Sequence, residues 1–370
     1  MKLQILQENL EKAVNITSRF ASTKAQLPIL GNLLISTKKS KIYISSTNLE
    51  ISASVQVGAK VDEEGEISIP SKVMLDLISN LPKETVTLES EKEQLKVTSD
   101  GFSSTILGID STDFPKVPSS VDDKNSISFS KKEIVESLAK VSFATSTDET
   151  RPILTGVLFI LDKDSMSLVA TDGFRLSKKV IPHKDLQTEK KFVVIPKGVL
   201  GEISRGIFET DDIVFDLEEN EKQILFGLEG TVLTSRLLEG DYPDFEKIIP
   251  KESRIKVFLD KEELLRAVKL ASIFARESAN VIKIKILKDS IKVTAESGQA
   301  GSQETKIDAK VEKEEVGEFE IAFNFRYLED FLHSVVGEEV LVKLLDSNSA
   351  GVFIDTSDSN YTHLIMPVKI

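Results

Sequence analysis

The sequence has 370 residues, of which 40 % are hydrophobic and 29 % are charged, and this length predicts two or three soluble globular domains. Its net charge of −13 disfavours nucleic-acid binding through overall charge, although it does not exclude a local basic surface. No Cys is present, which excludes disulfides, thiolate metal sites and cysteine nucleophiles, and no signal peptide or membrane span is visible, which predicts a cytoplasmic protein.

Each third of the chain opens with a short strand followed by an amphipathic helix. In chain order, apolar spacing predicts helices at residues 7–21, 70–81, 130–145, 196–208, 260–277 and 323–336. In the fifth helix, Asp260 and Glu263 have the spacing of a capping box. Its buried face is expected to hold Leu264, Leu265, Val268, Ala271 and Ile273. Between the helices, alternating apolar and polar residues predict antiparallel strands with one face in water.

Landmarks in the sequence recur in the same order at a nearly constant offset. "LPILGN" at 27–32 returns as "RPILTG" at 151–156, and "SIPSKV" at 68–73 returns as "VIPKGV" at 194–199. A more eroded third copy contains "IAFNFRY" at 321–327. The fold class is therefore predicted to be α+β, with three repeated domains at 1–122, 123–250 and 251–370. Each domain would place about two helices on one face of antiparallel sheets.

Few residues suggest chemistry. No Gly-rich phosphate-loop pattern occurs, and His183, His333 and His363 share no ligand spacing. Asp172 in "ATDG" is typical of a turn, with a catalytic role as the weaker alternative. No enzymatic activity, metal or other cofactor is therefore predicted. The apolar ending "HLIMPVKI" is consistent either with a last core strand or with part of a peptide-binding groove.

These features together resemble the bacterial replicative sliding clamp, the beta subunit of DNA polymerase III. The resemblance extends over the whole chain and rests on the threefold repeat, "LPILGN", "TRPILTGVLF" at 150–159, "VATDGFRLS" at 169–177 and the ending "MPVKI". It implies a non-catalytic processivity factor, a head-to-tail homodimer that closes into a ring of six domains. Helices would line a hole for duplex DNA, and sheets would form the outer wall.

The resemblance also implies the partners. Duplex DNA would be held by enclosure and without sequence preference, through weak phosphate contacts that permit sliding. The DNA polymerase III catalytic subunit, the clamp loader, repair polymerases and ligase would bind through short hydrophobic peptide motifs. Two alternatives from other classes are a three-domain peptide-binding scaffold that does not encircle DNA, and an enzyme whose site lies between domains.

The charge distribution agrees with helices that face DNA. The six expected helices carry 13 basic and 12 acidic residues, a net charge of +1. The rest of the chain carries 34 basic and 48 acidic residues, a net charge of −14. Negative charge therefore lies preferentially outside the helices, as expected if the outer wall does not meet phosphates.

By resemblance, a partner-peptide cleft lies between the second and third domains. The matched residues are Leu154, Thr171, Gly173, Phe174, Arg175, Leu176, Pro243, Lys247, Ile248, Leu364, Ile365, Met366, Pro367 and Val368. Apolar side chains would take the hydrophobic anchors of an extended peptide, and backbone groups around Gly173 and Arg175 would hold its polar positions. Phe174 and Lys247 depart from the family, where His and Arg are also found, so the cleft rim and a bidentate pairing would differ.

Two further contacts are implied by the resemblance. The residues matched to DNA contacts are Lys24, Lys72, Arg151 and Lys197, and for each of them a solvated surface charge is the alternative. The residues matched to the dimer interface are Phe102 and Ile106 on the first domain and Ile273 and Phe274 on the third. For Ile273, an inward position on its own helix is the alternative.

Overall fold

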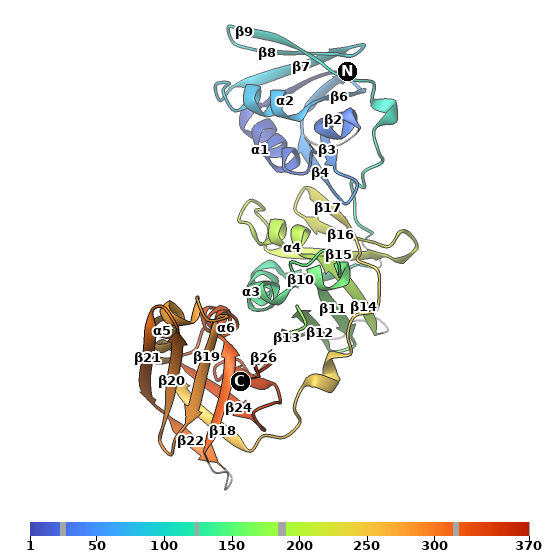
Figure 1. Ribbon diagram of the computed structural model, residues 1–370. Helices are drawn as coiled ribbons and strands as arrows, with labels where there is room; N and C mark the ends of the chain where they lie inside the picture. The colour runs from blue at the N-terminus through green and yellow to red at the C-terminus, as the bar shows by residue number, and fades with distance from the viewer. Residues whose placement is uncertain (23–26, 123–125, 184–189, 314–317, 370) are drawn as a thin grey trace. The chain divides into compact units, whose positions relative to one another are not determined.

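The structure is a computed structural model that describes residues 1–22, 27–122, 126–183, 190–313 and 318–369. The chain divides into two compact units, residues 1–134 with 198–237 and residues 135–197 with 238–370. Each unit is built around two antiparallel sheets (Figure 1). Within the described ranges, no helix is long and apolar enough to cross a membrane.

The α-helices of the described residues form where apolar spacing predicted them, each a few residues shorter than expected. They are α1 (Gln7–Ser18), α2 (Ser71–Ile78), α3 (Lys131–Val141), α4 (Lys197–Ser204), α5 (Lys261–Ala275) and α6 (Phe325–Ser334). The predicted third helix ends early because the chain tightens into a 3₁₀ turn at Ser142–Ala144. The Asp260 carboxylate caps α5 by accepting the backbone N–H of Glu263 at 2.9 Å, as the capping-box spacing predicted.

The buried face of α5 differs from the prediction at one position. The other four predicted residues are buried, but Ile273 is 58 % exposed. Ile273 follows Ala271 by two residues, which places it on the opposite side of the helix. Ser272 and Ala275 are buried instead. The inward position considered for Ile273 is therefore wrong.

The first unit contains a five-stranded and an eight-stranded sheet. The five-stranded sheet has the order β5 (Lys60–Glu63), β1 (Lys2–Leu6), β7 (Thr85–Glu91), β8 (Gln94–Ser99), β9 (Phe102–Leu107). The eight-stranded sheet has the order β10 (Ile127–Ser130), β15 (Asp212–Glu218), β16 (Gln223–Leu228), β17 (Thr231–Arg236), β4 (Ile51–Gly58), β3 (Lys41–Thr47), β2 (Asn32–Lys38), β6 (Glu66–Pro70). Helix α1 packs against α2 and against β3 and β4, and so covers one face of this sheet.

The second unit contains a nine-stranded and a four-stranded sheet. The nine-stranded sheet has the order β14 (Lys191–Pro196), β11 (Gly156–Asp162), β12 (Ser165–Thr171), β13 (Arg175–Pro182), β26 (Tyr361–Ile365), β25 (Gly351–Asp355), β24 (Glu339–Leu344), β18 (Ile255–Asp260), β22 (Lys310–Lys313). The four-stranded sheet has the order β21 (Gly301–Asp308), β20 (Ser290–Ser297), β19 (Val281–Ile286), β23 (Phe319–Asn324). Helix α5 packs against α6 and against β19, β20 and β21.

The larger sheet of each unit joins two successive copies of the sequence repeat. In the first unit, β17 of the second copy pairs with β4 of the first. In the second unit, β26 of the third copy pairs with β13 of the second. Strands of the three copies can be matched by their place in the strand order. One matched set is β4, β13 and β21, and the other is β9, β17 and β26. The remaining members of these two sets, β9 and β21, are edge strands of their sheets.

The helices carry none of the excess negative charge. Within the bounds given above they hold ten basic and ten acidic residues. The net charge of −13 therefore lies in the strands and connecting segments, in the direction predicted from the sequence.

Candidate functional site

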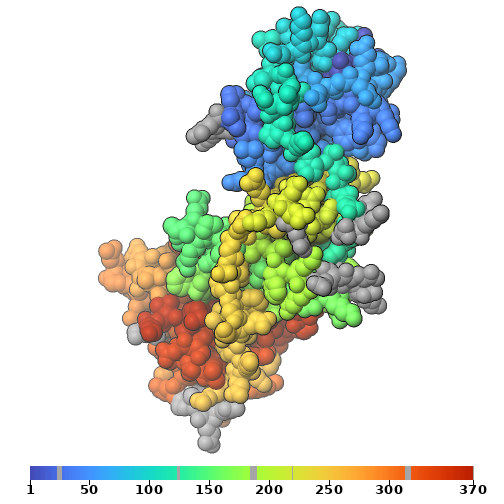
Figure 2. All heavy atoms as spheres, turned by 90° about the vertical axis from the view of Figure 1, so that its right-hand side faces the viewer, coloured from blue at the N-terminus to red at the C-terminus, as the bar shows by residue number. Residues whose placement is uncertain are grey.

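The residues matched to the partner-peptide cleft all lie in the second unit, and apart from Leu154, in the 3₁₀ turn at Pro152–Thr155, they lie on three segments. These are the strand ends around the turn at 171–175, the segment at 243–248 and the chain end at 364–368. One apolar cluster, which includes Leu176, Phe245 and Leu364, joins the three segments. Figure 2 shows the segment near residue 245, in gold, on the surface beside the red C-terminal residues.

The matched residues divide into a buried and an exposed set. The buried set, each at most 3 % exposed, is Leu154, Thr171, Leu176, Leu364 and Ile365. The exposed apolar set is Phe174 at 58 %, Ile248 at 46 % and Met366 at 37 %. Pro243 and Lys247 are exposed as well, and Pro367 and Val368 are half-buried. The buried set is therefore structural support, and the exposed set is available to a ligand.

The turn at 171–175 is fixed by its own side chains. Thr171 Oγ1 donates to the Arg175 carbonyl at 2.6 Å and accepts the N–H of Gly173 at 3.0 Å. Asp172 Oδ1 accepts the N–H groups of Phe174 at 2.9 Å and of Arg175 at 3.0 Å. Asp172 is thus a turn residue, as its Asp-Gly context predicted. Because these three N–H groups already bond within the turn, a bound peptide would have to use other polar groups.

The end of the chain is held against this turn. Strand β26 ends at Ile365, after which the Met366 N–H donates to the Phe174 carbonyl at 2.8 Å. The Val368 N–H donates to the Ala322 carbonyl at 2.9 Å. The interpretation as a last core strand is confirmed for Leu364, whereas Met366 lies beyond the strand with an exposed side chain and its role in a peptide-binding groove stays a prediction.

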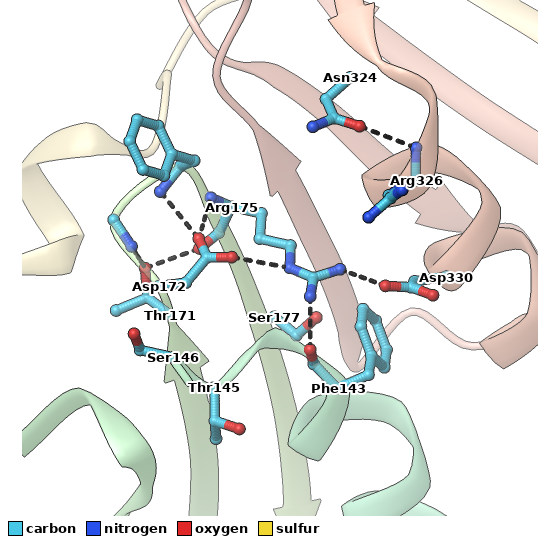
Figure 3. A network of polar contacts seen from close by, with 12 residues as sticks. Phe143, Thr145, Ser146, Thr171, Asp172, Arg175, Ser177, Asn324, Arg326 and Asp330 are labelled. Atoms are coloured by element: carbon cyan, nitrogen blue, oxygen red, sulfur yellow. Dashed lines mark hydrogen bonds and ion pairs between the residues drawn. The ribbon is translucent and has the colours of Figure 1, made fainter. Parts of the chain in front are cut away.

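The Arg175 side chain connects the turn to two other elements (Figure 3). Its Nε donates to Asp172 Oδ2 at 3.1 Å, and its terminal nitrogens donate to Asp330 Oδ2 on α6 at 2.5 Å and to the Phe143 carbonyl at 2.6 Å. The guanidinium also lies 4.6 Å from the ring centroid of Tyr327. This side chain is 10 % exposed, so it supports the surface from within.

The first unit contains the same turn, at residues 47–51. Thr47 and Asn48 make there the hydrogen bonds that Thr171 and Asp172 make in the second unit. The Arg236 N–H donates to the Glu50 carbonyl, as Met366 does to Phe174. The positions of Gly173, Phe174, Arg175 and Met366 are taken by Leu49, Glu50, Ile51 and Arg236. These hydrogen bonds are therefore shared by the turns of the first two copies of the repeat, whereas of these two turns only that of the second unit has the exposed Phe and Met and the buried Arg.

Three of the residues matched to DNA contacts are exposed in the structure. Lys72 and Lys197 lie in the first turns of α2 and α4, and Arg151 lies with its Nε 3.8 Å from Asp148 Oδ2. Although Lys197 is exposed overall, partial desolvation lowers its pKa; the nearby Arg175 also lowers it, and Asp330 opposes the shift. Lys24 lies outside the described residues.

The residues matched to the dimer interface lie on β9 and α5. On β9, Phe102 is half-buried and Ile106 is 4 % exposed, so Ile106 faces its own core, whereas the adjacent Leu107 is 69 % exposed. On α5, Ile273 lies near Leu270, which is 44 % exposed, and Phe274 packs partly against the core. Exposure thus singles out Leu107 and Leu270, which the resemblance did not identify.

The structure assigns no metal-binding role to the histidines it describes. Among the described residues, no group of three or more His, Asp or Glu side chains could hold a metal ion. His363 is buried, with Nδ1 2.6 Å from Ser177 Oγ and its ring stacked on Phe331. Desolvation, followed by the charge of Arg175, lowers its pKa to about 3, so it is neutral at pH 7.

Three copies of one α+β unit, with sheets that continue from copy to copy, define the class of DNA clamps. Family models of the N-terminal, central and C-terminal domains of the DNA polymerase III beta subunit match residues 1–118, 128–244 and 246–369. The chain belongs to this family, and it is a DNA sliding clamp, a processivity factor without catalytic activity.

Similar proteins align with the whole chain. The beta sliding clamp of Staphylococcus aureus is 29 % identical, with 100 % of this chain and 99 % of that protein aligned. The crystal structure of the Bacillus subtilis sliding clamp has a TM-score of 0.92 at 26 % identity and covers 100 % of this chain and 99 % of its own. That of the Pseudomonas aeruginosa clamp bound to griselimycin has a TM-score of 0.89 at 24 % identity and covers 100 % of both chains. The resemblance inferred from the sequence and the predicted α+β repeat fold are confirmed.

Proposed function

We propose that two copies of this chain join head to tail into a ring around duplex DNA and tether replication and repair proteins to it in the cytoplasm. The repeated domains would be 1–122, 123–250 and 251–370. The observation that carries this proposal is the pair of edge strands, β9 and β21. They match, in strand order, the strands that pair where one copy of the repeat joins the next within the chain.

The strand pairing between successive copies of the repeat predicts how the ring closes. Strands β4 and β13 each accept a strand of the following copy, β17 and β26 respectively. Pairing of β21 in one chain with β9 in a second chain would repeat this junction a third time. Two identical contacts of this kind give a closed ring of six repeats, because heterologous contacts close when their rotation sums to a full turn.

The side chains beside these strands support an interface. Exposed Ile273 and Leu270 would be covered together with Phe274 from the α5 side, and Phe102 from the β9 side. Ile106 would act by holding β9 on its own sheet, and Leu107 would make the contact. Burial of these apolar side chains would stabilise the dimer.

We assign the DNA-facing role to single cations at four positions of the chain. Lys72, Arg151 and Lys197, together with Lys24, would meet phosphates one at a time, and the helices carry no net negative charge to oppose this. Few single contacts give weak attachment that depends on salt. Enclosure would then retain the DNA, and the ring would slide.

The partner surface is assigned to Phe174, Ile248 and Met366, supported by the buried set beneath them. These side chains would take the apolar anchors of an extended peptide from the polymerase III catalytic subunit, the clamp loader, a repair polymerase or a ligase. Griselimycin, which the Pseudomonas aeruginosa relative binds, is proposed as a ligand of this chain too.

Light scattering tests the ring interface. At micromolar concentration the wild-type protein should have twice the mass of one chain, and Ile273→Asp should shift it toward a single chain. Phe192→Asp is the matched control, because Phe192 is 60 % exposed but lies on β14. A wild-type monomer at this concentration would contradict the ring.

Peptide binding tests the partner surface. Met366→Ala should weaken, and deletion of residues 366–370 should abolish, binding of a fluorescein-labelled tail peptide of a polymerase III catalytic subunit, with the dimer mass unchanged. Arg236→Ala, at the equivalent position in the first unit, should bind the peptide like wild type. Undiminished affinity after the deletion would show that the site is misplaced.

A further inference from the structure

Arg175 is not needed for the fold of the turn that contains it. The turn at 47–51 in the first unit makes the same internal hydrogen bonds with Ile51 at the equivalent position. The guanidinium of Arg175 therefore adds something that the repeat does without. What it adds is an attachment of the turn to α6.

The attachment continues from α6 to two of the three exposed apolar residues, Phe174 and Met366. Asp330 Oδ2 on α6 accepts from Arg175 at 2.5 Å, and Arg175 Nε donates to Asp172 Oδ2 at 3.1 Å. Asp172 in turn holds the N–H of Phe174, whose carbonyl receives the N–H of Met366. Figure 3 shows the part of this series that runs from Asp330 through Arg175 to Asp172.

We propose that Asp330 is a positioning residue for partner-peptide binding, which acts through Arg175 on the turn that carries Phe174 and on the chain end that carries Met366. The inference rests on the proposed function of this surface. Asp330 itself does not contact the peptide. Through its ion pair with Arg175, the Asp330 side chain fixes the position of the turn relative to α6.

Loss of the Asp330 carboxylate should change the position of the turn at 171–175 more than it changes the free energy of unfolding. The Asp330 side chain is 44 % exposed, and ion pairs of exposed groups contribute little to the free energy of unfolding. Without it, Arg175 keeps its bonds to Asp172 and to the Phe143 carbonyl. The unit would stay folded, and among the described residues of α6 the Tyr327 ring would be the one remaining group in contact with the guanidinium, without a hydrogen bond from α6 to hold the turn.

The neighbourhood of Lys197 gives the inference a second, independent signature. Both Arg175 and Asp330 act electrostatically on Lys197, with opposite signs. Replacing Asp330 by a neutral residue removes the carboxylate that opposes the effect of the Arg175 charge on Lys197, while Arg175 keeps its ion pair with Asp172. The loss of peptide affinity should therefore be larger at low salt than at high salt, because salt screens the repulsion.

Fluorescence polarisation with the labelled polymerase-tail peptide tests the inference. Asp330→Asn should weaken binding about three- to thirtyfold with an unchanged melting temperature and dimer mass, a range typical of coupling through packed networks. Glu329→Gln, which removes the same charge from the adjacent position of α6, should stay within about twofold of wild type. In an Arg175→Gln background, Asp330→Asn should add nothing further, since both changes break one connection.

Amide hydrogen exchange reads the position of the turn directly. The N–H groups of Phe174 and Arg175 should exchange faster in Asp330→Asn than in wild type, and Glu329→Gln should leave them unchanged. Wild-type affinity and exchange in Asp330→Asn would overturn the inference, as would a loss of affinity that follows a general loss of folding.

Failure of the inference and failure of the proposed function are distinguishable. If Met366→Ala weakens the peptide but Asp330→Asn does not, only the positioning role is wrong. If the wild-type protein does not bind the peptide, or Met366→Ala has no effect, the partner surface itself is wrong.

Discussion

Gly173 and Leu49 occupy the same position in two copies of one turn. Both have a left-handed backbone, with φ of +94° and +75°. Gly adopts this conformation freely, whereas a side chain there collides with the following carbonyl at a cost of about 1 to 2 kcal/mol. The two copies therefore store different amounts of strain in the same hydrogen-bonded frame.

Reciprocal substitutions at this position should have opposite effects on thermal unfolding. Gly173→Ala should destabilise the second unit by about 1 kcal/mol, although a Cβ there would meet nothing closer than an Arg151 guanidinium nitrogen at 3.7 Å. Leu49→Gly should be neutral or stabilising by up to about 1 kcal/mol, because relief of strain opposes the greater freedom of the unfolded chain. Equal destabilisation by both changes would show that strain does not distinguish the two turns.

Buried His363 should make the second unit sensitive to mild acid. The pKa of His363 in the folded protein is about 3, below the ordinary 6.5. Below pH 6.5, His363 is therefore protonated in the unfolded chain but stays neutral in the folded chain. The contribution of neutral His363 to stability is thus fully present above pH 6.5. The free energy of unfolding then falls by about 1.4 kcal/mol per pH unit as the pH drops toward 3.

Urea unfolding at several pH values measures this slope. The His363→Gln variant keeps an acceptor for Ser177. Its free energy of unfolding should be lower than that of wild type at pH 7.5, but it should change less with pH between pH 6.5 and 4.5. Parallel slopes for the two proteins would exclude His363 as the titrating group.

At the scale of elements, one carboxylate ties three segments of the second unit together. Asp358, in the turn before β26, pairs with Lys140 on α3 and with Lys179 on β13, whose Nζ lies 2.8 Å from both carboxylate oxygens. Burial alone would raise the pKa of Asp358, but the hydrogen bonds from the two lysines outweigh it and hold the pKa below its usual value. The three side chains are at most 16 % exposed.

Removal of this carboxylate should be costly. Asp358→Ala leaves two largely buried ammonium groups unpaired, and we expect a loss of about 2 to 3 kcal/mol in the free energy of unfolding. Glu338→Ala, which removes an exposed carboxylate, should stay within about 0.5 kcal/mol. A small effect of Asp358→Ala would mean that solvent reaches the two lysines.

The sequence predicted the helices better than the contacts between copies of the repeat. Apolar spacing located the α-helices of the described residues because periodicity is a local property, and it misplaced Ile273 only near a helix end. The tie between Arg175 and Asp330 spans 155 residues, and no local pattern records it. The shared turn was missed because the segments around Thr47 and Thr171 have little sequence in common, and their likeness is one of backbone hydrogen bonds.

At the scale of the whole molecule, the strand order explains why a chain of three repeats would act as half of a six-membered ring. Two junctions are made within the chain by strand pairing, and the corresponding strands β9 and β21 remain at sheet edges. Exposed edges are templates for pairing with another chain. A second copy of the same chain offers the complementary edge at both ends.

Retention on DNA tests this account most directly. The protein should be loaded onto nicked circular duplex DNA by an ATP-driven clamp loader, washed in high salt and measured before and after the circle is linearised. A ring that encloses the duplex stays on the circle in high salt, where phosphate contacts are screened, and is lost from the linear DNA. Equal retention on circular and linear DNA, or release from the intact circle in high salt, would contradict the account.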